Sequence, residues 1–78
     1  MELKDGAILK ITWFDDDKDV YTYDSKTKLF VNDGIKPFSK ELVTTEEELA
    51  YYIEHLDDAF KGIFYVQPTI KYYKLINN

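Results

Sequence analysis

One stretch of the chain, residues 44–60 (TTEEELAYYIEHLDDAF), has the periodicity of an amphipathic helix. Its apolar residues recur at spacings of four, three and four: Leu49, Ile53, Leu56 and Phe60. At about 100° per residue these side chains share one helix face, which Tyr52 widens. Because a small protein must bury such a face, the stretch predicts one helix packed on the rest of the fold.

Both ends of this stretch carry capping signals. Thr44 with Glu47, or Thr45 with Glu48, fits a capping box, in which the threonine oxygen accepts an unpaired backbone N–H and the glutamate reaches back. Gly62 suits a left-handed C-terminal cap. We therefore expect the helix to span the whole stretch.

Before the helix, three segments have the composition of β-strands: residues 7–14, 20–23 and 28–31. In the first, apolar side chains alternate with polar ones, which places Ala7, Leu9, Ile11 and Trp13 on one side and Lys10 and Thr12 on the other. An Asp-rich turn, residues 15–19, separates the first two segments, and residues 24–27 form the turn before the third, which the Asn-Asp-Gly turn at residues 32–34 ends. Three strands with short turns predict an antiparallel meander.

The connection into the helix and the C-terminal part complete the expected fold. Residues 35–43 contain Pro37 and are expected to be irregular, with Phe38 and Leu42 contacting the core. Residues 62–67 and 69–76 read as β-rich runs separated by Pro68. We predict a single α+β domain over residues 1–78: an antiparallel sheet of four to five strands, β-β-β-α-β(-β), with one amphipathic helix on one face.

Composition excludes several functional classes. The 78 residues contain no cysteine, so neither disulfides nor a thiolate metal site can form. No apolar run approaches the ~18 residues of a membrane span, and no signal peptide opens the chain, so a soluble, cytoplasmic protein is expected. All ten basic residues are lysine, and the lack of arginine disfavours direct nucleic-acid binding.

The distribution of charge is more informative than its sum of −5. Residues 41–60 hold seven acids and no lysine, whereas the remaining residues hold eight acids and ten lysines. Acids in the first helical turn are favoured by the helix dipole. Asp57 and Asp58 lack that explanation, because they lie near the opposite end with Glu54 as a like-charged neighbour. Where a local rule is broken without a stability gain, a functional constraint is expected.

A helical wheel places Glu47, Tyr51, Glu54 and Asp58 opposite the apolar face; we call these four residues the acidic ridge. The candidate binding residues are Glu47, Tyr51, Glu54, Asp57 and Asp58. Additional candidates are Asp15, Asp16 and Asp17, in the turn that follows the first expected strand. The expected partner is a protein with a basic surface, such as a nucleic-acid-handling enzyme. The alternative interpretation is a solvated helix face that keeps the protein soluble.

Metal-binding and catalytic patterns are incomplete. Asp15, Asp17 and Asp19 have the D-x-D-x-D spacing of a calcium loop, but Val20 stands where that loop needs glycine and Lys26 where it needs glutamate. The only histidine, His55, has no nucleophile or orienting partner in the pattern. We expect no metal, no cofactor and no enzymatic activity.

The last segment supports a second interpretation. The run from Lys71 through Tyr72 and Tyr73 to Lys74 interleaves basic and aromatic residues, as single-strand binding surfaces do. A plain strand gives the same pattern, with Tyr72 or Tyr73 facing the core. The alternative functions are therefore a nucleic-acid-binding domain that uses this strand, or a structural or oligomerising subunit held by a sheet edge.

In overall character, this short, cysteine-free, acidic, tyrosine-rich and arginine-free chain resembles small phage or mobile-element proteins. These include nucleic-acid-mimicking inhibitors such as some anti-CRISPR and anti-restriction proteins. The likeness is one of composition over the whole chain. It implies an inhibitor or modulator that acts through its acidic surface, and this is the function we expect.

Overall fold

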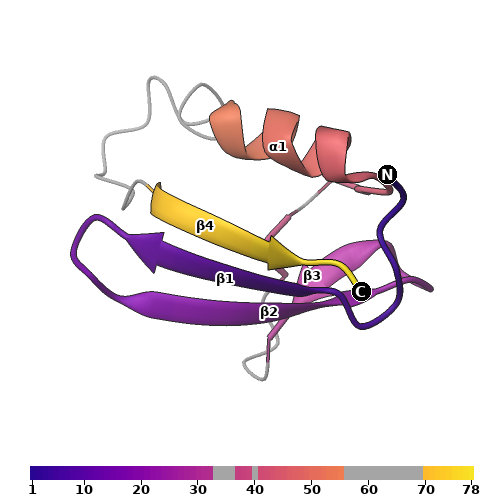
Figure 1. The fold of residues 1–78 in the computed structure, drawn as a ribbon, viewed down its shortest axis with the longest axis horizontal. Coiled ribbons are helices and arrows are strands. Elements are labelled where there is room, and N and C mark those ends of the chain that lie inside the picture. The colour runs from indigo at the N-terminus through magenta and orange to yellow at the C-terminus, as the bar shows by residue number, and fades with distance from the viewer. Residues whose placement is uncertain (33–36, 40, 56–69) are drawn as a thin grey trace.

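A computed structural model, described here for residues 1–32, 37–39, 41–55 and 70–78, contains an antiparallel sheet and a helix (Figure 1). The elements are β1 (Ile8–Trp13), β2 (Lys18–Asp24), β3 (Leu29–Val31), α1 (Glu46–Glu54) and β4 (Ile70–Ile76). The sheet order is β3-β2-β1-β4, with antiparallel pairing throughout. The predicted α+β fold is confirmed. The possible fifth strand, residues 62–67, lies outside the described residues.

One face of the sheet carries the core because side chains alternate along each strand. In and just before β1, Ala7, Leu9 and Ile11 are buried, as the alternation predicts. The register places Leu9 opposite Tyr21 and Tyr23 opposite Phe30, so these aromatic rings lie on the same face. We call this side the core face and the opposite side the open face.

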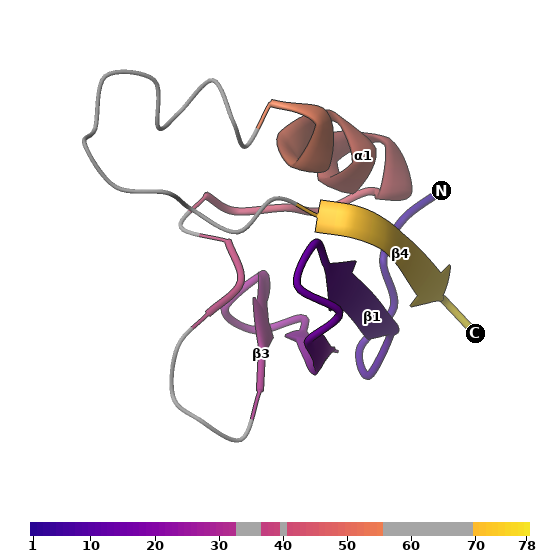
Figure 2. The same ribbon diagram turned by 90° about the vertical axis from the view of Figure 1, so that its left-hand side faces the viewer.

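The helix covers the core face. Leu49 is buried in the same cluster as the strand residues, and Ile53 is half-buried against it. Tyr52 packs its ring on Phe38, with 5.7 Å between ring centroids, and Phe38 packs on Tyr21 at 5.3 Å. Both views show α1 on one side of the sheet, above β4 (Figures 1 and 2). The other predicted apolar helix residues, Leu56 and Phe60, fall outside the described part of the chain.

The helix begins at the second of the two predicted capping pairs. Thr45 is the N-cap, and its hydroxyl oxygen accepts the backbone N–H of Glu48 at 3.1 Å. This bond satisfies one of the amide groups that a first turn leaves unpaired. The threonine half of the predicted capping box is therefore confirmed, whereas the carboxylate of Glu48 accepts the hydroxyls of Thr44 and Thr45.

The helix ends earlier than predicted. Its last residue is Glu54, and the C-cap His55 has φ −104° and ψ 8°, outside the helical region. The acidic residues that follow in the sequence are unfavourable at a helix C-terminus, which is consistent with an early end. Residues 56–60 and the proposed cap Gly62 are outside the described residues.

One predicted core contact in the connection is wrong. Phe38 packs on the core as expected, but Leu42 is 64% exposed and its neighbour Val43 is 2% exposed. Two hydrogen bonds hold Val43 in place. Its N–H donates to the backbone carbonyl of Lys28 at 3.1 Å, and its own carbonyl accepts the hydroxyl of Tyr23. In an extended segment a shift of one residue exchanges the buried and exposed sides.

The buried tyrosines predict a loss of stability at high pH. Burial raises the pKa of both Tyr21 and Tyr23 above their ordinary value, so the folded state binds the phenolic protons more tightly than the unfolded state. The free energy of unfolding should therefore be unaffected by these groups below about pH 10 and should fall as the pH rises above it. Urea unfolding across this range measures the effect.

The matched variant for this experiment is Tyr23→Phe. Lysine residues also titrate in this range, but they are common to both proteins and cancel in the comparison. The variant loses the hydrogen bond to Val43 and starts less stable by about 1 kcal/mol, yet its stability should fall less steeply with pH. An equal or steeper fall would show that Tyr23 does not contribute.

Candidate binding surface

The described part of α1 presents three members of the acidic ridge to solvent. Glu47, Tyr51 and Glu54 are exposed, and Tyr51 retains 64% of its accessible surface. Their exposure agrees with the helical wheel, because Leu49 is buried on the opposite side of the helix. Asp57 and the remaining ridge member, Asp58, lie outside the described residues. The binding role of all these residues stays a prediction.

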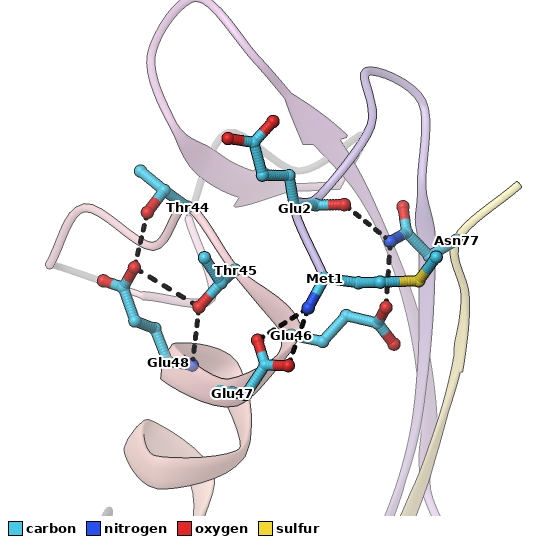
Figure 3. Close-up of polar contacts among 8 residues, drawn as sticks. All are labelled: Met1, Glu2, Thr44, Thr45, Glu46, Glu47, Glu48 and Asn77. Carbon is cyan, nitrogen blue, oxygen red and sulfur yellow. Dashed lines mark hydrogen bonds and ion pairs between the residues drawn. The ribbon is translucent and has the colours of Figure 1, made fainter.

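Glu47 already has a cationic partner (Figure 3). The α-amino group of Met1 lies 2.6 Å from one carboxylate oxygen of Glu47 and 2.9 Å from the other. Hydrogen bonding to this ammonium lowers the pKa of Glu47, and the same bond raises the pKa of the amino group. Because both groups are exposed, the pair adds little stability, but it reduces the charge that Glu47 offers to a partner.

The other glutamates of the first turn also have local contacts (Figure 3). A carboxylate oxygen of Glu48 accepts the hydroxyls of Thr44 and Thr45, beside the capping bond. A carboxylate oxygen of Glu46 accepts from the side-chain amide of Asn77 at 3.3 Å. These contacts tie the start of α1 to neighbouring segments. The helix dipole and these bonds thus explain why acidic residues occupy the first turn of α1.

Among the acidic residues that the structure describes in α1, Glu54 is the one whose position is not explained by a stabilising interaction. It lies in the last turn, where the dipole opposes a negative charge. It forms no ion pair with any residue in the described ranges. Next to it, His55 stacks on Tyr51 with 4.0 Å between ring centroids and 22° between planes. An exposed aromatic pair therefore borders a carboxylate that has no ion-pair partner among the described residues.

A pocket of about 290 Å³ lies between α1 and the segment that precedes it. Its lining residues are Glu41, Leu42 and Val43 on one side and Glu47, Glu48, Tyr51 and Tyr52 on the other. We call this the helix pocket. The hydroxyl of Ser39 holds Glu41 in place, because it donates to the carbonyl of Glu41 at 2.6 Å and accepts its N–H at 3.1 Å. The helix pocket thus combines carboxylates with exposed apolar surface.

Sequence reasoning missed the contribution of five residues to this pocket: Glu41, Leu42, Val43, Glu48 and Tyr52. Glu41 opens the lysine-free stretch, which is the one signal that pointed to it. The others line the pocket because of how residues 41–43 pack beside the helix. That packing is a tertiary feature and leaves no periodic pattern in the sequence.

Asp15, Asp16 and Asp19, in or beside the β1–β2 turn, each have a polar partner. Asp15 accepts the N–H of Asp17 at 3.1 Å, which is ordinary turn chemistry. Asp16 has φ 68°, a left-handed conformation that aspartate tolerates, and its carboxylate lies 2.9 Å from the ammonium of Lys71. Asp19 accepts the indole N–H of Trp13 at 2.7 Å. The residues that the structure describes include no group of ligands suited to a metal ion.

The turn and the start of the helix lie at opposite ends of the sheet. The backbone N–H of Glu46 donates to Met1 at 2.8 Å, so α1 begins where β1 starts and β4 ends. Asp15, Asp16 and Asp17 follow the far end of β1 (Figure 1). The structure therefore does not bring these aspartates to the Glu47 end of the acidic ridge.

The last segment forms the expected strand, with one of its two tyrosines on the core face. It pairs with β1, but neither tyrosine in its centre is buried, since Tyr72 is 58% and Tyr73 is 39% exposed. The flanking Lys71 and Lys74 are exposed too. The register places Tyr73 on the core face, opposite Ile11, and Tyr72 on the open face. Tyr73 keeps its exposure because β4 lies at an edge of the described sheet.

Within the part of the chain that the structure describes, no helix is long and apolar enough to cross a membrane. Comparison of the chain with protein-family models, with curated proteins and with solved structures found no match.

Proposed function

We propose that this chain is a non-enzymatic binding protein that engages a basic protein surface through α1 and the helix pocket. The observation that carries the proposal is the pocket itself, about 290 Å³ in volume and lined by three glutamates and two tyrosines. Leu42 and Tyr51 are both 64% exposed at this site, although they are large apolar or aromatic side chains. Such residues at a concave surface are typical of interface centres.

The chemistry of the pocket selects a cationic partner. Glu41 and Glu48 contribute carboxylates, which pair with lysine or, in a bidentate manner, with arginine. The rings of Tyr51 and Tyr52 can pack along the side-chain stem of such a residue and attract its charge. Neither Glu41 nor Glu48 forms an ion pair within the described ranges, so both carboxylates can accept such a partner.

A nucleic-acid-handling protein is the partner class that this surface fits best. Glu41, Glu47 and Glu48 line one pocket, and carboxylates grouped in this way can take the place of the phosphates of a nucleic-acid strand. The surface would then occupy a site that normally receives phosphates, and the chain would act as an inhibitor or modulator of that protein. Association should be fast and should weaken with salt.

The proposal is tested by capture of partners from the native host at low salt, with two tyrosine variants of similar exposure compared. Tyr51→Ala removes a ring at the helix pocket, and Tyr72→Ala removes a ring on the open face of the sheet. The expected result is a basic protein retained by the parent chain and by Tyr72→Ala, lost with Tyr51→Ala, and displaced by added DNA. Retention of the same protein by Tyr51→Ala would contradict the proposal.

A further inference from the structure

The open face of the sheet carries a charge pattern opposite to that of the helix. Strand pairing places Lys10 directly opposite both Val20 and Lys74, and Thr12 directly opposite both Lys18 and Tyr72. Directly opposite residues point to the same face. The open face therefore gathers the following residues, which we call the lysine face: Lys10, Thr12, Lys18, Val20, Tyr72 and Lys74. All except Thr12 are exposed.

The lysine face contains a pairing that stability does not favour. Lys10 and Lys74 are cross-strand neighbours, and like charges in this position destabilise a sheet. None of the three lysines forms an ion pair within the described ranges. Asp24, on the same side, sits at the end of β2 and accepts the N–H of Lys26 at 2.9 Å. Among the described residues, the positive charge of this face is thus left available.

The lysine face also presents exposed apolar and aromatic surface. Tyr72 is 58% exposed, although it lies in the middle of a strand, and Val20 is exposed beside Lys10. Thr12, between Tyr72 and Lys18, is the small residue at the centre of this row. A sheet face with an exposed ring among lysines that form no ion pair within the described ranges has the two elements that bind a single strand: a stacking platform and cations for the phosphate backbone.

From this arrangement we infer that the lysine face binds single-stranded nucleic acid without sequence preference. Bases stack on Tyr72, and Lys10, Lys18 and Lys74 contact phosphates. Without arginine the face has no bidentate reader of base edges, so recognition rests on charge and stacking. This site lies on the opposite side of the sheet from the helix pocket, and it does not depend on the function proposed for that pocket.

The test uses fluorescence anisotropy with labelled oligo(dT) and oligo(rU) of about a dozen nucleotides, a length within the range of one small binding domain. The parent chain should bind both, and log K should fall with log salt with a slope of about −2, as three phosphate contacts give on a single strand. The Lys10→Ala/Lys74→Ala variant should reduce the slope to about −0.7. Tyr72→Ala should weaken binding about tenfold without changing the slope.

Matched controls separate this site from general effects of charge and folding. Tyr51→Ala removes a tyrosine of similar exposure from the helix, and Lys26→Ala removes a lysine from the β2–β3 turn. Neither variant should alter the binding of the oligonucleotides. The Lys10→Arg/Lys74→Arg variant keeps both charges and should still bind.

Three results would overturn the inference. The first is no binding at about 50 mM salt. The second is equal binding of polyglutamate, which would show a general polyanion site. The third is sedimentation showing dimers that Glu54→Lys abolishes together with the anisotropy signal, which would assign the lysine face to the acidic surface of a second copy.

Discussion

Replacing Phe30 with alanine is expected to lower the free energy of unfolding by about 3–5 kcal/mol. Phe30 is fully buried at 0% exposure, and its ring packs on Tyr23 with 5.0 Å between centroids. Its carbonyl also accepts the N–H of Phe38 at 2.8 Å, so the cavity would lie where the connection joins the sheet. A chain of this length has a total stability of roughly 4–10 kcal/mol, so the variant should be close to unfolding.

Urea or thermal unfolding measures this loss, and Phe14→Ala is the matched control. Phe14 is 65% exposed, so its removal should change the free energy of unfolding by no more than about 0.5 kcal/mol. If the two variants lost similar stability, the assignment of Phe30 to the centre of the core would be wrong.

Changing both Glu41 and Glu54 to lysine is expected to weaken partner binding by about a hundredfold or more. Each substitution replaces an attraction to the basic partner with a repulsion, and a change of about 1.4 kcal/mol at each site is enough for this effect. The loss should grow smaller as salt is raised, because exposed charges are screened. Titration calorimetry with the captured partner at two salt concentrations measures both effects.

Loss of folding cannot account for the weaker binding of a Glu54 variant. A lysine in the last turn of α1 is favoured by the helix dipole, so Glu54→Lys should be slightly more stable than the parent chain. The control variant Asp17→Lys makes the same change in net charge, but in the exposed turn between β1 and β2. If Asp17→Lys weakened binding as much as Glu54→Lys, bulk charge rather than the helix surface would control recognition.

The elements of this fold could be predicted because their periodicities are strong and unmixed. The alternation at Ala7, Leu9 and Ile11 defines the core face of β1, and the spacing of Leu49 and Ile53 defines the inward side of α1. The capping threonine, Thr45, was one of two candidates, because local chemistry alone does not distinguish adjacent threonines. These predictions depend on interactions between residues close in sequence.

Features that depend on contacts between distant segments were not predictable. Leu42 and Val43 are both aliphatic, and only the bonds of Val43 to β2 and Lys28 decide which one is buried. The opposition of Lys10 and Lys74 follows from the pairing of β1 with β4, whose register the sequence does not specify. The helix pocket likewise requires residues 41–43 to lie beside α1.

The partner of Glu47 illustrates the same limit at the candidate site. The helical wheel places this residue on the exposed face, which the structure shares, but the ion pair with the amino group of Met1 depends on the path of the N-terminal segment. The binding candidates are thus unequal: Glu54 is unpaired within the described ranges, whereas Glu47 is engaged.

The most direct test of the central claim is to map the partner on the chain by backbone NMR. An isotope-labelled chain titrated with the captured basic protein should show shifts confined to residues 41–43 and 47–55, around the helix pocket and the exposed side of α1. The claim would be contradicted if α1 showed no shifts and the changes fell elsewhere. The open face, residues 8–12 and 72–76, and the β1–β2 turn, residues 15–17, are the places to examine.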